Sequence, residues 1–267
     1  MTSMPGHRKI IINNQMLRRH YNELRQGDIV LGRVSLRPGE EHLLLDLVER
    51  GVLLIPAALP QVISRSKSMQ ADVFAAWMPP LTRSIHDVHQ LLDAMAFFSS
   101  EEQVITKLES KNAGLGVHLW SSIEDVYTHA TLGSLPFPFV LQPFHDGARD
   151  VRVIVIGDFI EAYERHNPVN FRNNLHFGGE RRPWLLTDGQ LEICRQVMAR
   201  GKFPYAHIDL MITSDTEYLL EINLRGGIRG AAIGPQEYQE MVAARQQEIL
   251  EELQGMENDL YPNPFVG

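Results

Sequence analysis

The stretch that decides the fold is residues 218–230, YLLEINLRGGIRG. Its first half has the composition of a buried β-strand, yet it contains Glu221, and Asn223 follows two positions later. Because alternate residues of a strand point to the same face, this carboxylate and this amide share a face. A charged residue is seldom fully buried without a partner. The pair therefore lies either on a solvated face or at a site that binds something.

A second acidic residue comes close to this pair. Residues 206–224, AHIDLMITSDTEYLLEINL, predict a hairpin with its turn at residues 214–215, which makes Asp209 and Glu221 near neighbours across the ladder. Two carboxylates on one face repel each other unless a cation lies between them. Carboxylate and amide oxygens suit a hard cation such as Mg²⁺. The pattern predicts a metal site formed by Asp209, Glu221 and Asn223.

Composition limits the classes of protein that this chain fits. Its 267 residues are enough for about two domains. The formal net charge of −8 argues against nucleic-acid binding, which needs a basic surface. Cys194 is the one cysteine of the sequence, so an intramolecular disulfide is excluded. No apolar run approaches the roughly 20 residues that span a bilayer, and the run at residues 10–12 is too short for a signal peptide. We expect a soluble cytoplasmic protein that binds neither membrane nor nucleic acid.

Strands and helices alternate along the chain. Residues 28–34 and 51–56 have strand composition and flank a helical segment at 38–50, so they predict a β-α-β unit with parallel strands. Further strands are predicted at 103–108, 117–120 and 138–144, with a hairpin over 149–165 that turns at residues 157–158. Helices are predicted at 188–201, where Gly201 closes the helix, and at 235–253.

A phosphate-binding element is indicated by residues 105–119, ITKLESKNAGLGVHL. Lys107 interrupts an apolar strand, where an isolated ammonium group is costly to bury. The following loop carries Gly114 and Gly116, and the backbone N–H groups of such loops can surround phosphate oxygens. The alternative is a lysine that extends to solvent beside a flexible turn.

Taken together and in order, these motifs resemble the ATP-grasp superfamily, and within it the RimK-like amino-acid ligases related to glutathione synthetase. The resemblance covers about residues 28–235 and rests on VITKLESKNAGLGVHL (104–119), FVLQPF (139–144), RDVRVIVIGDFIEAYER (149–165), NFRNNLHFGG (170–179) and the predicted metal-binding hairpin. It implies an α/β (α+β) ATP-grasp fold whose two lobes clamp ATP. The implied domains are a reduced N-terminal β-α-β domain at 1–66, a small lobe at 67–140, and a large lobe at 141–267 that carries the metal site.

The resemblance also implies a role for each matching residue. Cofactor binding is implied for Lys67, Lys107, Gly114, Gly116, Gln142, Pro143 and Phe144, the last three as the adenine hinge. Catalytic roles at the transferring phosphoryl group are implied for Arg152, Arg165 and Asn174, with Arg172 in the same region. Asp209, Glu221 and Asn223 are implied to hold one or two Mg²⁺ ions.

The implied activity is that of an ADP-forming carboxylate–amine ligase. ATP would activate a carboxylate as an acyl phosphate, and an amine from an amino acid or peptide-like substrate would then attack it. Two alternatives stay open, a small-molecule kinase and a non-catalytic nucleotide-binding module. The resemblance also admits assembly into a homo-oligomer.

The sequence departs from the family pattern at several positions. Pro143 stands where the family usually has glutamate. The resemblance implies that either Arg65 or Lys67 corresponds to the family's first ATP-contacting lysine. After Asn223 the usual S-x-P-G is replaced by a segment that adds Arg225 and Arg229. We expect one of these arginines to bind a carboxylate of the substrate; the alternative is an ion pair with an acidic residue such as Asp209 or Glu237. One clear β-α-β unit precedes residue 65, which is fewer than the family usually has.

Overall fold

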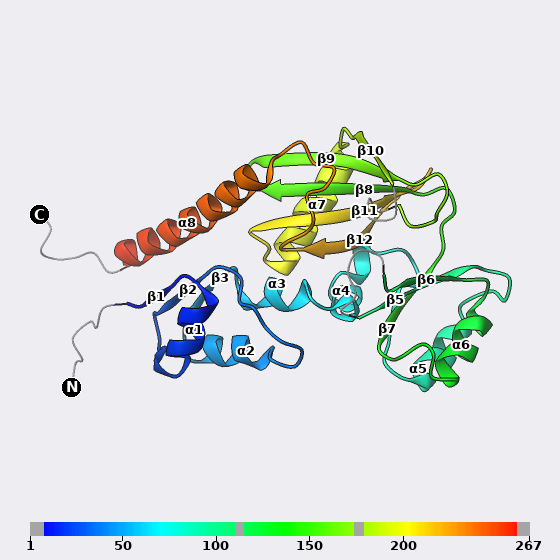
Figure 1. Ribbon diagram of the computed structural model, residues 1–267, viewed down its shortest axis with the longest axis horizontal. Helices are drawn as coiled ribbons and strands as arrows, with labels where there is room; N and C mark the ends of the chain where they lie inside the picture. Colours follow the sequence, from blue (N-terminus) through cyan, green and yellow to red (C-terminus); the bar gives the residue numbers. More distant parts are fainter. Residues whose placement is uncertain (1–7, 110–114, 174–178, 261–267) are drawn as a thin grey trace, which may run out of the picture. The chain divides into compact units, whose positions relative to one another are not determined.

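A computed structural model describes residues 8–109, 115–173 and 179–260 (Figure 1). The chain separates into two compact units. Unit 1 comprises residues 1–62, 202–204 and 235–267, and unit 2 comprises residues 63–201 and 205–234. Within the described ranges, every helix is too short or too polar to cross a lipid bilayer.

Unit 1 is built on a three-stranded parallel sheet in the order β1-β2-β3. Its elements are β1 (Ile10–Ile11), α1 (Asn14–His20), the 3₁₀ turn η1 (Tyr21–Glu23), β2 (Ile29–Leu31), α2 (His42–Glu49), β3 (Leu53–Ile55), most of α3 (Ala58–Ile63) and α8 (Pro235–Leu260). The predicted parallel pairing of β2 and β3 is confirmed. The preceding β1 and α1 were not predicted, because β1 has two residues and α1 buries only Leu17, which leaves no clear periodicity.

The C-terminal helix α8 belongs to unit 1. Leu250 packs with Ile29 of β2 and Ile55 of β3, and Ile249 and Leu253 lie beside them. The sequence had grouped residues 235–267 with the metal-binding hairpin, whereas α8 completes the core of the N-terminal sheet.

The first half of unit 2 contains a four-stranded antiparallel sheet in the order β4-β7-β5-β6. Its core holds Leu91, Val126, Phe139 and Leu141, which join the sheet to α5 and α6. The elements are α4 (Lys67–Val73), the 3₁₀ turn η2 (Ala75–Trp77), β4 (Arg83–Ile85), α5 (Val88–Met95), β5 (Val104–Leu108), β6 (Val117–Trp120), α6 (Ile123–Thr131) and β7 (Phe139–Pro143).

The second half of unit 2 contains a five-stranded antiparallel sheet in the order β10-β9-β8-β11-β12. Both predicted hairpins are confirmed, and Gly157 adopts a positive φ of 57° at the first turn. The elements are β8 (Arg149–Ile156), β9 (Phe159–His166), β10 (Glu180–Pro183), α7 (Asp188–Gly201), β11 (Tyr205–Ile212) and β12 (Glu217–Asn223).

The two faces of this sheet differ in chemistry. Val151, Val153 and Ile208 alternate with Arg152 and Asp209 and are fully buried. One face is therefore apolar. The other, called here the charged face, carries Asp150, Arg152, Tyr163, Arg165, Asp209, Glu221 and Asn223.

A β-bulge in β12 shifts the alternation of its side chains, so that its apolar residues stay on the apolar face and its polar residues on the charged face. Glu221 pairs with Asp209, but the next pair is Leu219 with Leu210, so Leu220 is an extra residue without a ladder partner. Leu219 and Ile222 are three positions apart, yet both are fully buried. The bulge therefore explains why YLLEIN lacks strict alternation.

The end of α7 differs from the prediction. Gly201 was expected to close the helix, but it is a buried residue of the last turn, and Lys202 takes the left-handed conformation with φ of 56°. A lysine thus occupies a backbone conformation that usually favours glycine.

Candidate active site

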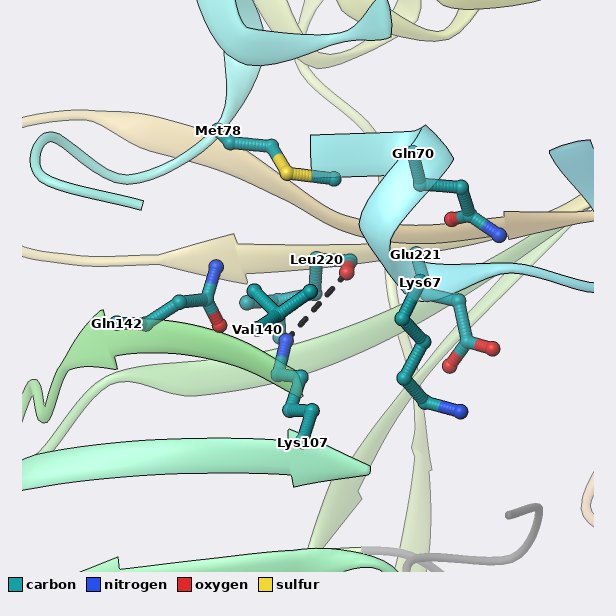
Figure 2. Close-up of a pocket in the computed structure, with 8 residues that line it drawn as sticks. All are labelled: Lys67, Gln70, Met78, Lys107, Val140, Gln142, Leu220 and Glu221. Atoms are coloured by element: carbon teal, nitrogen blue, oxygen red, sulfur yellow. Dashed lines mark hydrogen bonds between the residues drawn. The ribbon is translucent and has the colours of Figure 1, made fainter. Parts of the chain in front are cut away.

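A pocket in unit 2 lies between the four-stranded sheet and β12 (Figure 2). Its walls contain apolar side chains, two lysine ammonium groups, two glutamine amides and one glutamate carboxylate. It is lined by Lys67, Gln70, Met78, Lys107, Val140, Gln142, Leu220 and Glu221. An apolar pocket with a few converging polar groups is the usual form of a small-molecule site.

Lys107 points into this pocket from β5. Its Nζ donates a hydrogen bond of 3.5 Å to the carbonyl oxygen of Leu220, the bulged residue of β12 (Figure 2). Burial lowers the pKa of Lys107 to about 8, against the opposing attraction of Glu221. Binding of an anion beside Nζ would offset the cost of burying the ammonium group.

Lys67 reaches the same pocket from the first turn of α4, whereas Arg65 is not among the lining residues. The N-terminus of α4 is held by Glu109, whose carboxylate accepts hydrogen bonds from the Ser68 N–H at 2.6 Å and the Lys67 N–H at 3.2 Å. The Ser66 hydroxyl donates to the same carboxylate at 3.3 Å. Glu109 was not predicted from the sequence as a functional residue. It could have been noticed because it follows Lys107 by two positions, and alternate residues of an extended segment point to the same side.

Of the three residues predicted to form the adenine hinge, one lines the pocket and the other two are paired with the backbone of the neighbouring chain segment. Gln142 lines the pocket, and its Nε2 donates to the Thr82 hydroxyl at 2.9 Å. The Phe144 N–H already donates to the carbonyl of Gln103 at 2.9 Å, and Pro143 pairs with Val104. Gln142 is thus the hinge residue whose side chain reaches the pocket.

Two of the predicted residues, Gly114 and Asn174, lie outside the described residues. Gly116 lies at the end of the β5–β6 loop, where its carbonyl accepts a hydrogen bond of 2.8 Å from the Leu108 N–H. Arg172 donates its Nε to the carbonyl of Val117 at 3.1 Å, which links the segment after β9 to the start of β6.

Asp209 is the centre of the charged face. Its carboxylate accepts two parallel hydrogen bonds from Arg152, Nε to Oδ1 at 2.8 Å and Nη2 to Oδ2 at 2.9 Å. Arg165 adds an ion pair, Nη2 to Oδ2 at 2.9 Å, and also pairs with Asp150 at 2.5 Å. Burial by itself would raise the pKa of Asp209, but Arg152 and Arg165 outweigh it and hold this pKa well below its usual range. Sequence reasoning did not foresee this network.

The oxygen donors of the predicted metal site lie side by side. Asp209 is opposite Glu221 in the β11–β12 ladder, and His207 is opposite Asn223. Neither Glu221 nor the Asn223 side chain makes a hydrogen bond or ion pair with any residue in the described ranges. The Oδ2 atom of Asp209 accepts from both arginines, which leaves one lone pair on Oδ1.

These three oxygen donors fit a magnesium ion that is also coordinated by ligands from outside the protein. Over residues 8–109, 115–173 and 179–260, no group of three or more His, Cys, Asp or Glu side chains is placed to hold a metal ion. Two carboxylates and one amide would therefore supply part of an octahedral shell. Mg²⁺ commonly completes such a shell with water and phosphate oxygens.

His207 is a packing residue rather than a free base. Burial, and then the charge of Arg152, lower its pKa to about 4, so its ring is neutral at pH 7. A Cβ atom placed on Gly226 would lie 2.7 Å from Nδ1 of His207. The first glycine after β12 thus makes room for the His207 ring.

In unit 2, two antiparallel sheets flank a pocket whose lining includes Lys67 and Lys107. The chain belongs to the RimK-like ATP-grasp domain family, whose pattern matches residues 65–244. The predicted α+β ATP-grasp fold is confirmed. No curated protein sequence matches the chain.

Solved structures of low sequence identity share this fold. The ADP complex of PurK, N5-carboxyaminoimidazole ribonucleotide synthetase, is 16% identical with a TM-score of 0.59, and the match covers 82% of this chain but 58% of PurK. The D-cycloserine synthetase DcsG is 15% identical with a TM-score of 0.59, covering 82% of this chain and 84% of DcsG. The D-alanine–D-alanine ligase from Bacillus anthracis, complexed with ATP, is 15% identical with a TM-score of 0.58, covering 90% and 85%.

Proposed function

We propose that this protein is an ATP- and Mg²⁺-dependent ligase that joins a carboxylate to an amine of an amino acid or peptide-like substrate. The observation that carries the proposal is the continuity between the lysine-lined pocket and the charged face. Glu221 lines the pocket and is also the cross-strand partner of Asp209. A nucleotide in the pocket would thus bring its phosphates to the oxygen donors. Membership of the RimK-like ATP-grasp family supports the same activity.

In this proposal the nucleotide lies between the apolar side chains of the pocket. Met78, Val140 and Leu220 provide surfaces for the base, and Gln142 provides polar atoms at its edge. Lys107 and Lys67 bind the phosphate oxygens, since ammonium groups in a partly buried site interact strongly with anions. The roles at the phosphates that the resemblance implies for Gly114 and Gly116 are part of the same proposal. The structure favours Lys67 over Arg65 as the first cation, because Lys67 lines the pocket.

Glu221, Asn223 and the free lone pair of Asp209 would hold the magnesium ion. When bound, the ion neutralises charge on the phosphate oxygens and orients them for transfer. Asp209 has a second role in this arrangement, because it fixes the guanidinium group of Arg152 by two hydrogen bonds.

Arg152, Arg165 and Asn174 would act on the transferring group. Arg152 and Arg165 are held in fixed orientations by Asp209 and Asp150, so they need little reorganisation to stabilise developing charge. The carboxylate oxygen attacks the γ-phosphorus and ADP leaves with the bridging oxygen. The amine nitrogen then attacks the acyl carbon, loses a proton, and inorganic phosphate leaves. Positioning and charge neutralisation supply most of the catalysis in such transfers.

Product analysis tests the proposal. The purified protein is incubated with ATP, Mg²⁺ and pools of amino acids and short peptides, and the nucleotides are separated by chromatography. A ligase releases ADP and phosphate only when acid and amine are both present. A stable phosphorylated product would identify the kinase alternative, and nucleotide binding without turnover would identify a non-catalytic module. Release of AMP and pyrophosphate would contradict all three. We also propose that the protein is located in the cytoplasm, where ATP is available.

A further inference from the structure

The Gln142 amide at the wall of the pocket has one polar atom paired and one unpaired. Its Nε2 donates a hydrogen bond of 2.9 Å to the Thr82 hydroxyl. Among the residues that the structure describes, none donates a hydrogen bond to its Oε1. The Gln142 side chain is 3% exposed, and Figure 2 shows Oε1 on the side of Val140 while Nε2 points away from it. A buried oxygen without a partner is costly, so this atom is placed to accept a hydrogen bond from a ligand in the pocket.

The direction of the Gln142 amide is set by Thr82. The Thr82 hydroxyl donates its proton to the carbonyl oxygen of Pro79 at 2.7 Å. A carbonyl oxygen can only accept, and two oxygens at this distance would repel each other without a proton between them. The hydroxyl oxygen therefore acts as an acceptor toward Gln142 and must face its NH₂ group. This chain of contacts removes the usual ambiguity between the oxygen and the nitrogen of a glutamine amide.

The position of Thr82 is fixed by a tight turn at residues 79–82. The turn is closed by a hydrogen bond of 3.1 Å from the Thr82 N–H to the Pro79 carbonyl. Leu81 takes a φ of 63°, which favours glycine at the third position of a turn. Leu81 packs against the core between the four-stranded sheet, α5 and α6, which stabilises this conformation. The turn directly follows Met78, which lines the pocket.

An accepting atom in this position distinguishes between purine bases. Adenine carries an amino group at C6, which donates hydrogen bonds, whereas hypoxanthine and guanine carry an oxygen there, which accepts them. Oε1 of Gln142 can pair with the amino group. Against a 6-oxopurine it would leave two acceptors facing each other, both buried and without a proton. The orientation of one amide thus decides which base the pocket accepts.

We propose that Thr82 sets the base selectivity of the pocket, by holding the Gln142 amide with its oxygen toward the 6-position of a purine. Thr82 is a positioning residue, since it acts through Gln142 and is not among the residues that line the pocket. The inference rests on the proposed function, because it requires a nucleotide in this pocket. Without the Thr82 hydroxyl the amide is free to rotate, and it can then present Nε2 to a 6-oxopurine as well as Oε1 to a 6-aminopurine.

Nucleotide binding tests the inference without turnover. Dissociation constants are measured by calorimetry, with Mg²⁺, for ADP, for IDP, and for purine riboside diphosphate, which has only hydrogen at C6. We expect the wild type to bind ADP at least about tenfold more tightly than IDP, which is about 1.4 kcal/mol, with purine riboside diphosphate between them. Thr82→Val replaces the hydroxyl by a methyl group and should bring the ADP-to-IDP ratio below about threefold. Thr82→Ser keeps the hydroxyl and should keep the ratio.

Thr131→Val is the matched control. The Thr131 hydroxyl also donates to a backbone carbonyl, that of Tyr127 at 2.9 Å, but it lies on α6. This variant should leave the ratio unchanged. Thr82→Ala also lacks the hydroxyl and takes the place of Thr82→Val if that variant is unstable. In a Gln142→Leu background, which has no amide to orient, Thr82→Val should change the ratio no further.

The possible outcomes separate the inference from the proposed function. Equal affinity of the wild type for ADP and IDP would overturn the inference, and so would an unchanged ratio in the variants that lack the Thr82 hydroxyl. A further fall of the ratio in the Gln142→Leu background would show that Thr82 does not act through this amide. If none of the nucleotides binds, the proposed function itself fails, whereas tight binding without selectivity overturns only the role of Thr82.

Discussion

Asp209 and Arg152 are direct cross-strand partners, joined by two parallel hydrogen bonds of 2.8 and 2.9 Å. Asp209 is 6% exposed, so its negative charge is stabilised by Arg152 and Arg165 rather than by water. The same carboxylate would contribute a lone pair to a magnesium ion. The proposed function thus gives Asp209 a metal-binding role in addition to its ion pairs, whereas it gives Glu221 a metal-binding role alone.

Replacing Asp209 should damage the fold as well as the activity. Asp209→Ala leaves two guanidinium groups without their shared acceptor, and breaking a buried pair in this way costs about 3–5 kcal/mol. We expect a loss of this size in the free energy of unfolding, measured by urea denaturation, together with loss of turnover. Asp215→Ala, at the exposed turn of the same hairpin, is the control and should change stability little. A stability equal to that of wild type in Asp209→Ala would show that the arginines do not depend on this carboxylate.

Replacing Glu221 should affect metal binding but not the fold. Glu221 makes no hydrogen bond with a described residue, so Glu221→Gln should unfold at nearly the same urea concentration as wild type. Binding of Mn²⁺ in the presence of ADP, followed by electron paramagnetic resonance, should weaken by more than about tenfold because one charged oxygen ligand is lost. Glu217→Gln, in the same strand, is the matched control. Unchanged Mn²⁺ affinity in Glu221→Gln would remove Glu221 from the metal site.

The sequence predicted local relationships well. The Asp209–Glu221 pair follows from strand alternation and a short turn, and both features are readable within 18 residues of sequence, from 206 to 223. The pairing of Asp209 with Arg152 is different, because β11 returns to β8 after β9, β10 and α7 have intervened. No local pattern encodes that register. The short β1 was missed for a related reason, since its two residues are specified by pairing with β2 rather than by their own composition.

Nucleotide binding should depend on pH through Lys107. Because the pKa of Lys107 in the nucleotide-free protein is about 8, the side chain is charged at pH 7 and mostly neutral at pH 9. Phosphates require the charged form, so ATP affinity should fall by about tenfold between pH 7 and pH 9, and binding at pH 9 should take up a proton. Calorimetry in buffers of different ionisation enthalpy measures both effects. Lys107→Met should bind ATP weakly and without this pH dependence.

The same pKa predicts the sign of the effect on stability. Burial lowers the pKa of Lys107 from 10.5 to about 8, so between these values the unfolded chain binds more protons than the folded protein. Stability of the nucleotide-free protein should therefore rise with pH across this window, relative to Lys107→Met. A parallel pH dependence of unfolding in the two proteins would show that Lys107 is not buried in solution.

Glu109 should position Lys67. Its carboxylate accepts hydrogen bonds from the Lys67 and Ser68 N–H groups at the start of α4. Glu109→Ala removes this cap, which should cost about 1 kcal/mol of stability and weaken ATP binding, since Lys67 loses its fixed orientation. The double variant Glu109→Ala with Lys67→Ala should bind ATP no more weakly than Lys67→Ala alone. Glu101→Ala, an exposed residue before β5, serves as the control. Additive losses in the double variant would show that Glu109 acts independently of Lys67.

The two neighbouring glycines after β12 should respond differently to the same substitution. A Cβ on Gly226 would lie 2.7 Å from Nδ1 and 2.8 Å from Cγ of His207, whereas a Cβ on Gly227 would meet no atom within 4 Å. The His207 ring is 2% exposed and has little room to move. Gly226→Ala should therefore lower the free energy of unfolding by about 1–3 kcal/mol, as overpacking does in other cores. Gly227→Ala should leave it nearly unchanged. Adding His207→Ala to Gly226→Ala removes the ring that clashes, so the second substitution should cost less stability in the Gly226→Ala background than in wild type. If both glycine variants are equally stable, the close approach of Gly226 to His207 does not exist in solution, and the segment after β12 is free to start from a different position.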